Sequence, residues 1–210
     1  TGAFDESAAE IVAFHDNRLF IVNAQAGSVT VIDASDPTAP GAGAAPLTID
    51  APTAGMTANS VAIRADGLGV IALQAPTKTD AGELLFFDAN PATPVVLGTV
   101  TVGALPDMVA ISADGAYAVV ANEGEPADDF SIDPEGSVGV VALPQTVAAP
   151  TQADVRIADF HAFEDGNLPD GVRVFGPTPH GDDLPVSRNL EPEYVTIDGG
   201  TAYATVQEAN

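Results

Sequence analysis

The chain has 210 residues, of which 30 are acidic and six basic, so its formal net charge at pH 7 is −24. Such a charge repels nucleic acids and anionic membrane surfaces and attracts cations, so we expect no nucleic-acid partner. The absence of cysteine excludes disulfides and thiolate zinc sites. No apolar run reaches the length of about 18 residues that predicts a transmembrane helix. The charge is compatible both with an acidic surface that keeps the protein soluble and with a metal site.

An apolar strand, a tight turn and a second apolar strand occur four times along the chain. The four copies begin with EIVAFHDNRLFIVN, NSVAIRADGLGVIALQ, DMVAISADGAYAVVAN and EYVTIDGGTAYATVQE. Asp-Asn, Asp-Gly and Gly-Gly pairs stand at the turns, where a tight hairpin needs positive φ. We expect a third strand in the first three copies, at residues 28–33, 83–88 and 137–143. Further apolar stretches follow, as at residues 95–102 and 155–160.

Repeats of three or four antiparallel strands with a period of roughly 50 residues are typical of β-propeller blades. No amphipathic helices of the kind that parallel βαβ units require are apparent, and a β-solenoid, the structural alternative, usually has shorter repeats. We therefore predict an all-β fold, a β-propeller built of antiparallel blades. The blade-like repeats lie near residues 8–50, 57–103, 105–160 and 191–210, with a long insertion at 161–190.

The fourth copy has two strands, which would leave an open edge of unpaired backbone groups. We therefore expect residues 1–210 to be the N-terminal part of a single propeller domain, about three and a half blades of a larger propeller with seven blades. The expected partner is the remaining half of that propeller, present as a further chain or fragment.

Oxygen-bearing side chains recur at two places in each copy. The first place directly precedes the first strand, and the second lies at the end of the second strand. Because antiparallel strands return to the side where they began, both places should face one end of the propeller channel. Carboxylate and amide oxygens suit a hard cation such as Ca²⁺, although polar residues also begin turns wherever strands end. The residues before the first strands are Glu10, Asn59, Asp107 and Glu193. Those at the ends of the second strands are Gln25, Gln74, Asn122 and Glu208.

Two segments add candidate ligands at the same end. The loop after the third copy's second strand, EGEPADDFSIDPEGS, contributes Glu123 and Glu125 and, more weakly, Asp128, Asp129, Asp133 and Glu135. A mobile acidic loop explains this loop equally well, and its spacing does not match an EF-hand. The long insertion contributes His161, His180, Asp182, Asp183 and Arg188. His15 falls at the opposite end of its strand and is set aside.

Six stretches spread from residue 4 to residue 210 carry a family resemblance: FDESAAEIVAF, LFIVNAQAGSVTVID, ALPDMVAISADGAYAVVANEGEP, IDPEGSVGVV, GVRVFGP and NLEPEYVTIDGGTAYATVQEAN. At these stretches the chain resembles the choice-of-anchor I family of secreted or surface-attached bacterial β-propeller proteins. The resemblance implies a secreted or cell-surface setting, extracellular or periplasmic. Some members are described as atypical alkaline phosphatases and others only as surface glycoproteins. The acidic motifs carried over are Glu6, Glu10, Asn122, Glu123, Glu125, Glu191, Glu193 and Glu208.

Two functions follow as hypotheses. The first is a surface interaction module with an acidic end that binds Ca²⁺ or another hard divalent cation and recognises a surface ligand. The alternative is a metal-dependent phosphoesterase that acts on a phosphate ester, with weak candidates for catalysis in Arg188 and His180. No nucleophile elbow, phosphate-binding glycine loop or HExxH motif is present in the sequence.

Overall fold

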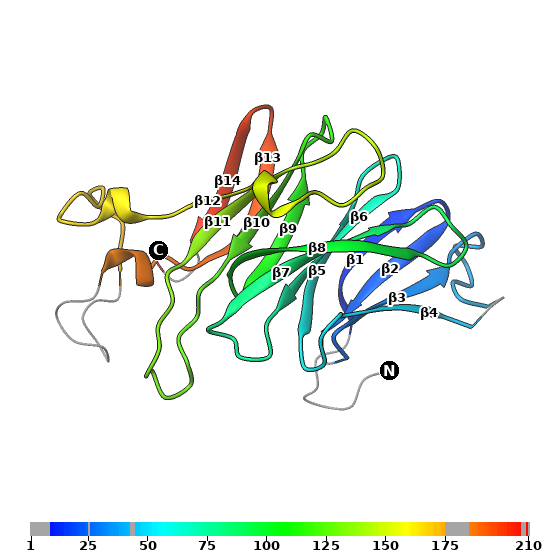
Figure 1. Cartoon of the computed structure of the whole chain (residues 1–210), viewed down its shortest axis with the longest axis horizontal. Helices are drawn as coiled ribbons and strands as arrows, with labels where there is room; N and C mark the ends of the chain where they lie inside the picture. Colours follow the sequence, from blue (N-terminus) through cyan, green and yellow to red (C-terminus); the bar gives the residue numbers. More distant parts are fainter. Residues whose placement is uncertain (1–8, 25, 43–44, 175–184, 207–208, 210) are drawn as a thin grey trace.

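The protein is described by a computed structural model that covers residues 9–24, 26–42, 45–174, 185–206 and 209 (Figure 1). Within these residues, fourteen strands form three four-stranded sheets and one two-stranded sheet. Every strand pair is antiparallel, and neighbours in each sheet follow the order of the chain. The prediction of an all-β fold built of antiparallel blades is confirmed.

Each sheet is one blade, numbered here from the N-terminus. Blade 1 contains β1 (Ala9–His15), β2 (Arg18–Asn23), β3 (Ser28–Asp33) and β4 (Leu47–Asp50). Blade 2 contains β5 (Thr57–Ile63), β6 (Leu68–Gln74), β7 (Ala81–Asp88) and β8 (Val95–Ala104). Blade 3 contains β9 (Pro106–Ile111), β10 (Tyr117–Asn122), β11 (Ser137–Ala142) and β12 (Val155–Ala158). Blade 4 is described as β13 (Pro192–Asp198) and β14 (Thr201–Val206). Three short 3-10 helices are η1 (Gln152–Asp154), η2 (His161–Phe163) and η3 (Val186–Arg188).

The hairpin between the first two strands of each blade turns where the sequence predicts. Asp16 and Asn17 have φ values of 46° and 56°, and Gly67, Gly115 and Gly199 have values of 95°, 72° and 57°. Positive φ is what two-residue hairpins require, and Asn, Asp and Gly tolerate it best. These turns place the two inner strands of every blade side by side.

The hydrophobic core lies between the blades. Alternate side chains of β6 point to opposite faces of blade 2, as in any strand. Ile71 packs with Phe20 and Phe87 in a cluster between blades 1 and 2, whereas Val70 packs with Val120 in a cluster between blades 2 and 3. A third, smaller cluster joins blade 3 to Val195 of blade 4. Figure 1 shows the resulting fan of sheets, from blue β1 to red β14.

A phenylalanine and a glycine fix the packing of blade 2. The rings of Phe20 and Phe87 stack with their centroids 5.7 Å apart. Gly69 pairs with Phe87 across the sheet, and a Cβ atom added to Gly69 would lie 2.1 Å from the Phe87 ring. Glycine is therefore required beside this ring, and truncating Phe87 would destabilise the core by about 3–5 kcal/mol.

The two ends of the fan expose apolar side chains. In blade 1, Ile11 and Ala13 pack against the core, and Val12 and Phe14, on the other face of β1, are 58% and 63% exposed. At the other end, Tyr203 of β14 is 56% exposed. Among the described residues, each end of the fan therefore presents apolar side chains to solvent.

Candidate functional site: an acidic opening at the inner strands

The four inner strands begin around one opening. A cavity of about 310 Å³ is lined by two consecutive residues from each of β1, β5, β9 and β13. The first residues of these pairs are Glu10, Asn59, Asp107 and Glu193, and the second are Ile11, Ser60, Met108 and Tyr194. The lining contains no lysine or arginine. The structure thus brings together the four oxygen-bearing residues that the repeat alignment places before the inner strands.

A β-bulge in each inner strand turns these residues toward the opening. In blade 2, Ala58 pairs with Leu73 and Ser60 pairs with Ala72, so Asn59 is an additional residue without a cross-strand partner. Glu193 is the additional residue in blade 4, and the registers of β1 and β9 shift at Glu10 and Asp107. Bulges redirect side chains and are common next to functional sites. The same irregularity in all four blades places one oxygen-bearing side chain from each blade at the opening.

Hydrogen bonds between blades hold the inner strands around the opening. The Asn59 side chain donates to the carbonyl oxygen of Pro106 at 3.0 Å. The next residue of β5, Ser60, accepts through its hydroxyl from the backbone N–H of Val109 at 3.2 Å. At the next junction, the Met108 sulfur accepts from the N–H of Val195 at 3.3 Å. These bonds hold the starts of the inner strands β9 and β13 to the blade before each of them.

Burial and nearby carboxylates raise the pKa of Asp107. Burial raises the pKa of Asp107 from 3.8 to about 6, and the neighbouring charges of Glu193, Glu10 and Glu125 add to the rise. Like charges close together in a partly buried site disfavour ionisation. A divalent cation between these groups would remove this repulsion, so the electrostatics of the opening favour binding of a cation.

Glu123 continues the acidic group beyond the end of β10. Burial raises its pKa from 4.5 to about 8, and the charges of Glu125, Asp107, Glu191 and Glu193 raise it further. Two backbone bonds to the segment before β9 hold it in place: Glu123 N–H donates to Leu105, and Gly124 N–H donates to Ala104. The φ of Gly124 is 76°, and an added Cβ would meet the Glu135 backbone at 2.8 Å. The loop therefore has to turn here, and the turn keeps Glu123 within electrostatic range of Asp107.

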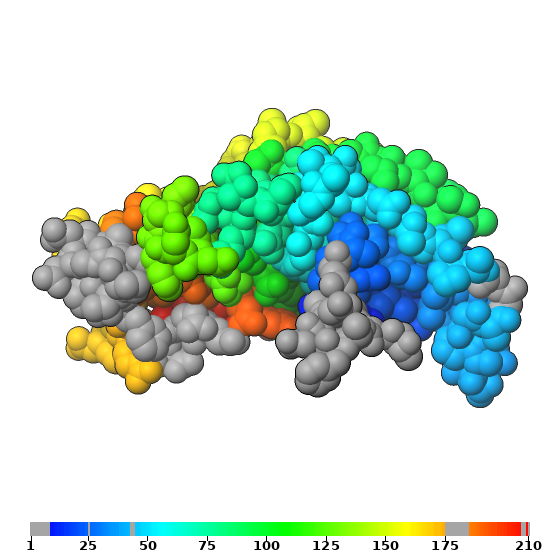
Figure 2. All heavy atoms as spheres, turned by 90° about the horizontal axis from the view of Figure 1, so that it is seen from below, coloured from blue at the N-terminus to red at the C-terminus, as the bar shows by residue number. Residues whose placement is uncertain are grey.

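The single lysine of the chain joins blade 2 to the acidic loop. Its ammonium group lies 3.2 Å from Glu125 and 3.0 Å from Asp128. Seen from below in Figure 2, the segments near residues 80 and 130, in teal and lime green, lie side by side. Burial lowers the pKa of Lys78, but its bonds to Asp128 and Glu125 outweigh burial and leave the pKa raised. Lys78 thus neutralises part of the charge beside the opening.

Asn122 lies outside the lining of the opening. Its side chain is fully buried and points between blades 2 and 3, where an added Cβ on Gly103 would meet it at 2.7 Å. Its amide donates to the Ser137 hydroxyl at 3.2 Å. Asn122 is two residues after Val120 and therefore lies on the same face of β10. Because Val120 packs in the core between blades 2 and 3, Asn122 points into that core and not into the opening.

The remaining acids of the loop have different surroundings. Asp129 is exposed and accepts hydrogen bonds from the backbone and hydroxyl groups of Ser131, as turn residues do. Asp133 is half-buried, and Arg188 lies on η3, away from the lining of the opening. The predicted candidates His180, Asp182, Asp183 and Glu208 are outside the described residues.

A second group of possible metal ligands lies where the long insertion meets the acidic loop of blade 3. Ligand atoms of Glu135, His161 and Glu164 are all within 4.8 Å of one another. His161 Nε2 is 2.6 Å from Glu135, and Nδ1 is 3.4 Å from Asp159. Both contacts raise the pKa of His161, and the hydrogen bond with Glu135 contributes most. The buried Ser187 hydroxyl donates to Glu164 at 2.5 Å. Histidine and carboxylates can hold a transition metal, and protonated His161 can equally bridge the acids without one.

Lys78, Glu164 and Ser187 were not among the residues predicted from sequence. Lys78 lies in a plain loop, and no spacing rule links it to a glutamate 47 positions away. The signal in the sequence was that Lys78 is the single lysine among 210 residues. In a chain with 30 acidic residues, such a lysine is expected to form an ion pair with one of them.

Together, the blades and the acidic opening define a β-propeller domain with a candidate cation site at one end of its inner strands. The family model of the choice-of-anchor I domain matches residues 10–210. The chain therefore belongs to the choice-of-anchor I family, and the predicted family is confirmed. It is a surface-associated, β-rich domain. Among the described residues, no helix is long and apolar enough to cross a membrane.

One solved structure is similar in part. Hydrazine synthase from Kuenenia stuttgartiensis is 18% identical, with a TM-score of 0.45, over 66% of this chain and 33% of that chain. The chain thus spans about a third of the length of that relative. A comparison with curated proteins finds no match.

Proposed function

We propose that this chain is part of a secreted or cell-surface propeller whose acidic opening binds a hard divalent cation, with Ca²⁺ the best fit. The observation that carries the proposal is the convergence of Glu10, Asn59, Asp107 and Glu193 on one cavity. Three carboxylates and an amide are oxygen donors, and Ca²⁺ accepts six to eight such ligands in flexible geometry. The cation would neutralise charges that now repel one another and would lock the inner strands of four blades together.

The raised pKa of Asp107 and Glu123 supports the same site. Both acids are held close to other carboxylates, and repulsion contributes to the rise in each case. The Lys78 ammonium group neutralises only the outer part of the group, at Glu125 and Asp128. A cation in the opening would favour the ionised forms of both acids, and it would allow Glu123, whose pKa is raised to about 8, to ionise at neutral pH.

The experiment is a calorimetric titration of the metal-free protein with Ca²⁺ and, separately, Mg²⁺. Asp107→Asn and Glu193→Gln should each weaken Ca²⁺ binding at least about tenfold, because each removes a charged ligand from the opening. Asp198→Asn is the matched control, because Asp198 lies at the far end of β13 from Glu193 and its substitution removes the same charge. Unchanged affinity in both opening variants would refute the site.

The propeller is proposed to serve as an interaction module at the surface, with the ion acting structurally. Binding of an ion to the native state alone stabilises that state by mass action. Chelation should therefore lower the melting temperature, and millimolar Ca²⁺ should restore it. A melting temperature that is equal in chelator and in millimolar Ca²⁺ would exclude a structural ion.

The second candidate function is a metal-dependent phosphoesterase. It is favoured by one observation: two acids with strongly raised pKa values lie beside further carboxylates, and perturbed groups of this kind gather at catalytic sites. In such an enzyme the metal would polarise the phosphoryl oxygen and activate a water molecule. Arg188 is a candidate for binding the phosphate. The assay is hydrolysis of a chromogenic phosphomonoester and phosphodiester, with and without chelator. No metal-dependent turnover at any alkaline pH would exclude this function.

Further blades are the proposed partner of the two exposed ends. Val12 and Phe14 at one end and Tyr203 at the other offer apolar surface, and β14 pairs only with β13 among the described strands. Open strand edges of this kind attract pairing with other strands. Residues 1–210 expressed alone should then aggregate or be rescued by an added downstream half, and a monodisperse monomer with a cooperative melt would contradict the proposal.

A further inference from the structure

Two segments that are distant in sequence bring a histidine and two glutamates together outside the acidic opening. Glu135 comes from the acidic loop of blade 3, His161 begins η2, and Glu164 directly follows η2. One ligand atom from each residue lies within 4.8 Å of the other two. The group contains an imidazole nitrogen, which the lining of the opening does not, so it has a different ligand chemistry.

The short helix η2 places two of these ligands on the same side. A 3-10 helix has three residues per turn, so side chains three positions apart lie over one another. His161 and Glu164 have this spacing, and the N–H of Glu164 donates to the His161 carbonyl oxygen at 3.2 Å. The rings of Phe160 and Phe163 pack with their centroids 6.3 Å apart across the same turn. The local fold thus holds an imidazole and a carboxylate next to each other.

Asp159 orients the imidazole of His161. One oxygen of its carboxylate accepts the backbone N–H of His161 at 3.2 Å, and the other lies 3.4 Å from Nδ1. The second ring nitrogen, Nε2, then faces Glu135 at 2.6 Å. Histidines that bind metals commonly have a carboxylate at the nitrogen that does not bind, because this partner sets the tautomer and the ring orientation. His161 therefore presents Nε2 as a metal ligand does.

Ser187 holds both glutamate segments in place. Its side chain is fully buried, and its hydroxyl donates to Glu164 at 2.5 Å. Its carbonyl oxygen accepts from the N–H of Gly136, the residue after Glu135, at 3.2 Å. One buried residue of η3 thus connects the carboxylate of one ligand to the backbone beside another. Contacts of this kind behind the ligands are typical of built metal sites.

We propose that Glu135, His161 and Glu164 bind a first-row transition metal ion of the Zn²⁺ type. One imidazole nitrogen and two carboxylate oxygens are ligands that Zn²⁺ takes at about 2.0–2.2 Å. The nitrogen favours such an ion over Ca²⁺, which takes oxygen ligands. A tetrahedral ion keeps its ligands roughly 3.3 Å apart, so the ion replaces the proton between Nε2 and the Glu135 oxygen and widens their 2.6 Å contact.

The exposure and charge of the group suit an ion that arrives from solvent. The side chains of His161 and Glu135 are 57% and 37% exposed, so the ligands are accessible without unfolding. A divalent ion neutralises the two glutamate charges that the fold brings together. With three ligands from the protein, the fourth position of a tetrahedral ion stays open to water or to a small anion.

The test is titration of the metal-free protein with Zn²⁺, followed by calorimetry, and with Co²⁺, followed by its visible absorption. We expect one ion per chain, with the imidazole NMR signals of His161 shifting as Zn²⁺ binds. His161→Gln and Glu164→Gln should each weaken Zn²⁺ binding at least about tenfold, because each removes one of three ligands. Zn²⁺ affinity in His161→Gln equal to that of the parent protein would overturn the proposal.

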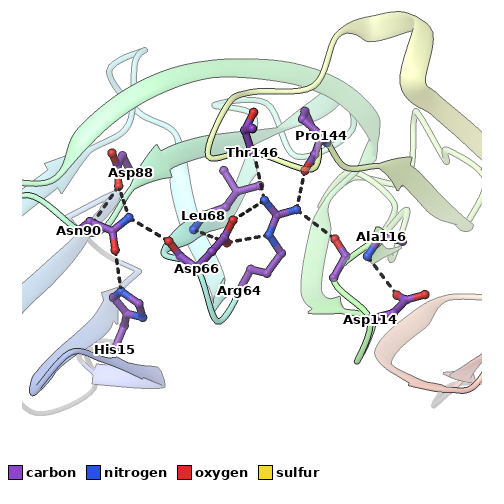
Figure 3. A network of polar contacts seen from close by, with 11 residues as sticks. His15, Arg64, Asp66, Leu68, Asp88, Asn90, Asp114, Ala116, Pro144 and Thr146 are labelled. Carbon is purple, nitrogen blue, oxygen red and sulfur yellow. Dashed lines mark hydrogen bonds and ion pairs between the residues drawn. The ribbon is translucent and has the colours of Figure 1, made fainter.

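His15→Gln is the matched control for the loss of a histidine. His15 Nε2 lies 3.3 Å from the side-chain oxygen of Asn90, a neutral amide, as Figure 3 shows. This variant should bind Zn²⁺ within about twofold of the parent protein. A shift of the His15 signals with Zn²⁺, in place of those of His161, would place the ion elsewhere and overturn the proposal.

Competition with Ca²⁺ separates this group from the acidic opening. Millimolar Ca²⁺ should leave Zn²⁺ affinity within about twofold, because the two ions prefer different ligands. The expectation stands whether or not the opening itself binds Ca²⁺, so the two proposals fail independently. Displacement of Zn²⁺ by Ca²⁺, together with unchanged Zn²⁺ affinity in Glu164→Gln, would assign the ion to the opening and contradict a site at His161.

Discussion

Lys78 and Glu125 form an ion pair 3.2 Å long between blade 2 and the loop of blade 3, although they are 47 positions apart in sequence. The pair places one positive charge beside Glu125, whose own charge contributes to the raised pKa of Asp107 at the opening. A cation that binds in the opening experiences this charge as repulsion.

Removal of that charge should therefore strengthen cation binding. Lys78→Met is expected to tighten Ca²⁺ binding about two- to fivefold, because interactions between partly exposed charges contribute roughly 0.2–1 kcal/mol. The measurement is calorimetry at low and high salt, and the gain should shrink as salt screens the interaction. Arg156→Met is the control, since Arg156 is exposed and donates only to carbonyl groups of Ala153 and Val155. An equal gain in both variants would mean that net charge alone governs binding.

The raised pKa values predict how the metal-free protein responds to pH. The pKa rises from 4.5 to about 8 for Glu123 and from 3.8 to about 6 for Asp107. At a pH between the ordinary and the raised pKa of each group, the folded protein retains a proton that the unfolded chain has released. The free energy of unfolding therefore falls as pH rises. The contribution of Glu123 should fall through the window from pH 4.5 to 8 and level off above it.

Urea unfolding in chelator between pH 5 and 9 measures this decline. Glu123→Gln should flatten it, because the amide does not titrate, and saturating Ca²⁺ should reduce it in the parent protein. Glu83→Gln is a control on an acid outside the group. Stability that rises with pH across this window, unchanged by Glu123→Gln, would contradict the burial of Glu123 among carboxylates.

His161 provides a second pH-dependent contact. Its pKa is raised by Glu135 first and then by Asp159, so its contribution is fully present below pH 6.5 and is lost as pH rises through the folded pKa. Glu135→Gln should lower the pKa of His161, because it removes the contact that contributes most to raising it, and an NMR titration of the imidazole protons measures the change. An unchanged pKa would show that the 2.6 Å contact does not persist in solution.

Arg64 is predicted to be the main polar contribution to the junction of blades 2 and 3. Arg64→Ala should lower the free energy of unfolding by roughly 2–4 kcal/mol, because it removes the charge-assisted bonds to Asp66 and leaves three carbonyl groups of blade 3 unsatisfied. Arg156→Ala, whose bonds lie within its own segment, should change it by less than about 0.5 kcal/mol. Similar losses from both would contradict a special role for Arg64.

The fold was predictable because its signals are local. Apolar strands and tight turns of Asp, Asn and Gly recur in every copy, and these features set hairpins without reference to the rest of the chain. The short β4 was not predicted as a strand, since LTID has little pattern of its own. Its partner β3 provides the pairing that makes it a strand.

The site was predictable only in part, because one of its two groups depends on register. Glu10 and Asp107 reach the opening through bulges, and their places before the inner strands were enough to align them. Asn122, at the end of β10, follows regular alternation from Val120 and faces the core between blades. A shift of one residue in a strand moves a side chain to the other face of the sheet. The sequence does not show where a bulge causes such a shift.

The most direct test of the cation site is the anomalous scattering of crystals soaked in Tb³⁺, a luminescent ion that takes the place of Ca²⁺, with Ca²⁺ competition as the control. The account predicts a single strong peak in the opening, within about 2.3–2.6 Å of oxygen atoms from Glu10, Asp107 and Glu193, that excess Ca²⁺ displaces. No peak in the opening, or a peak only at Glu135, His161 and Glu164, would contradict it.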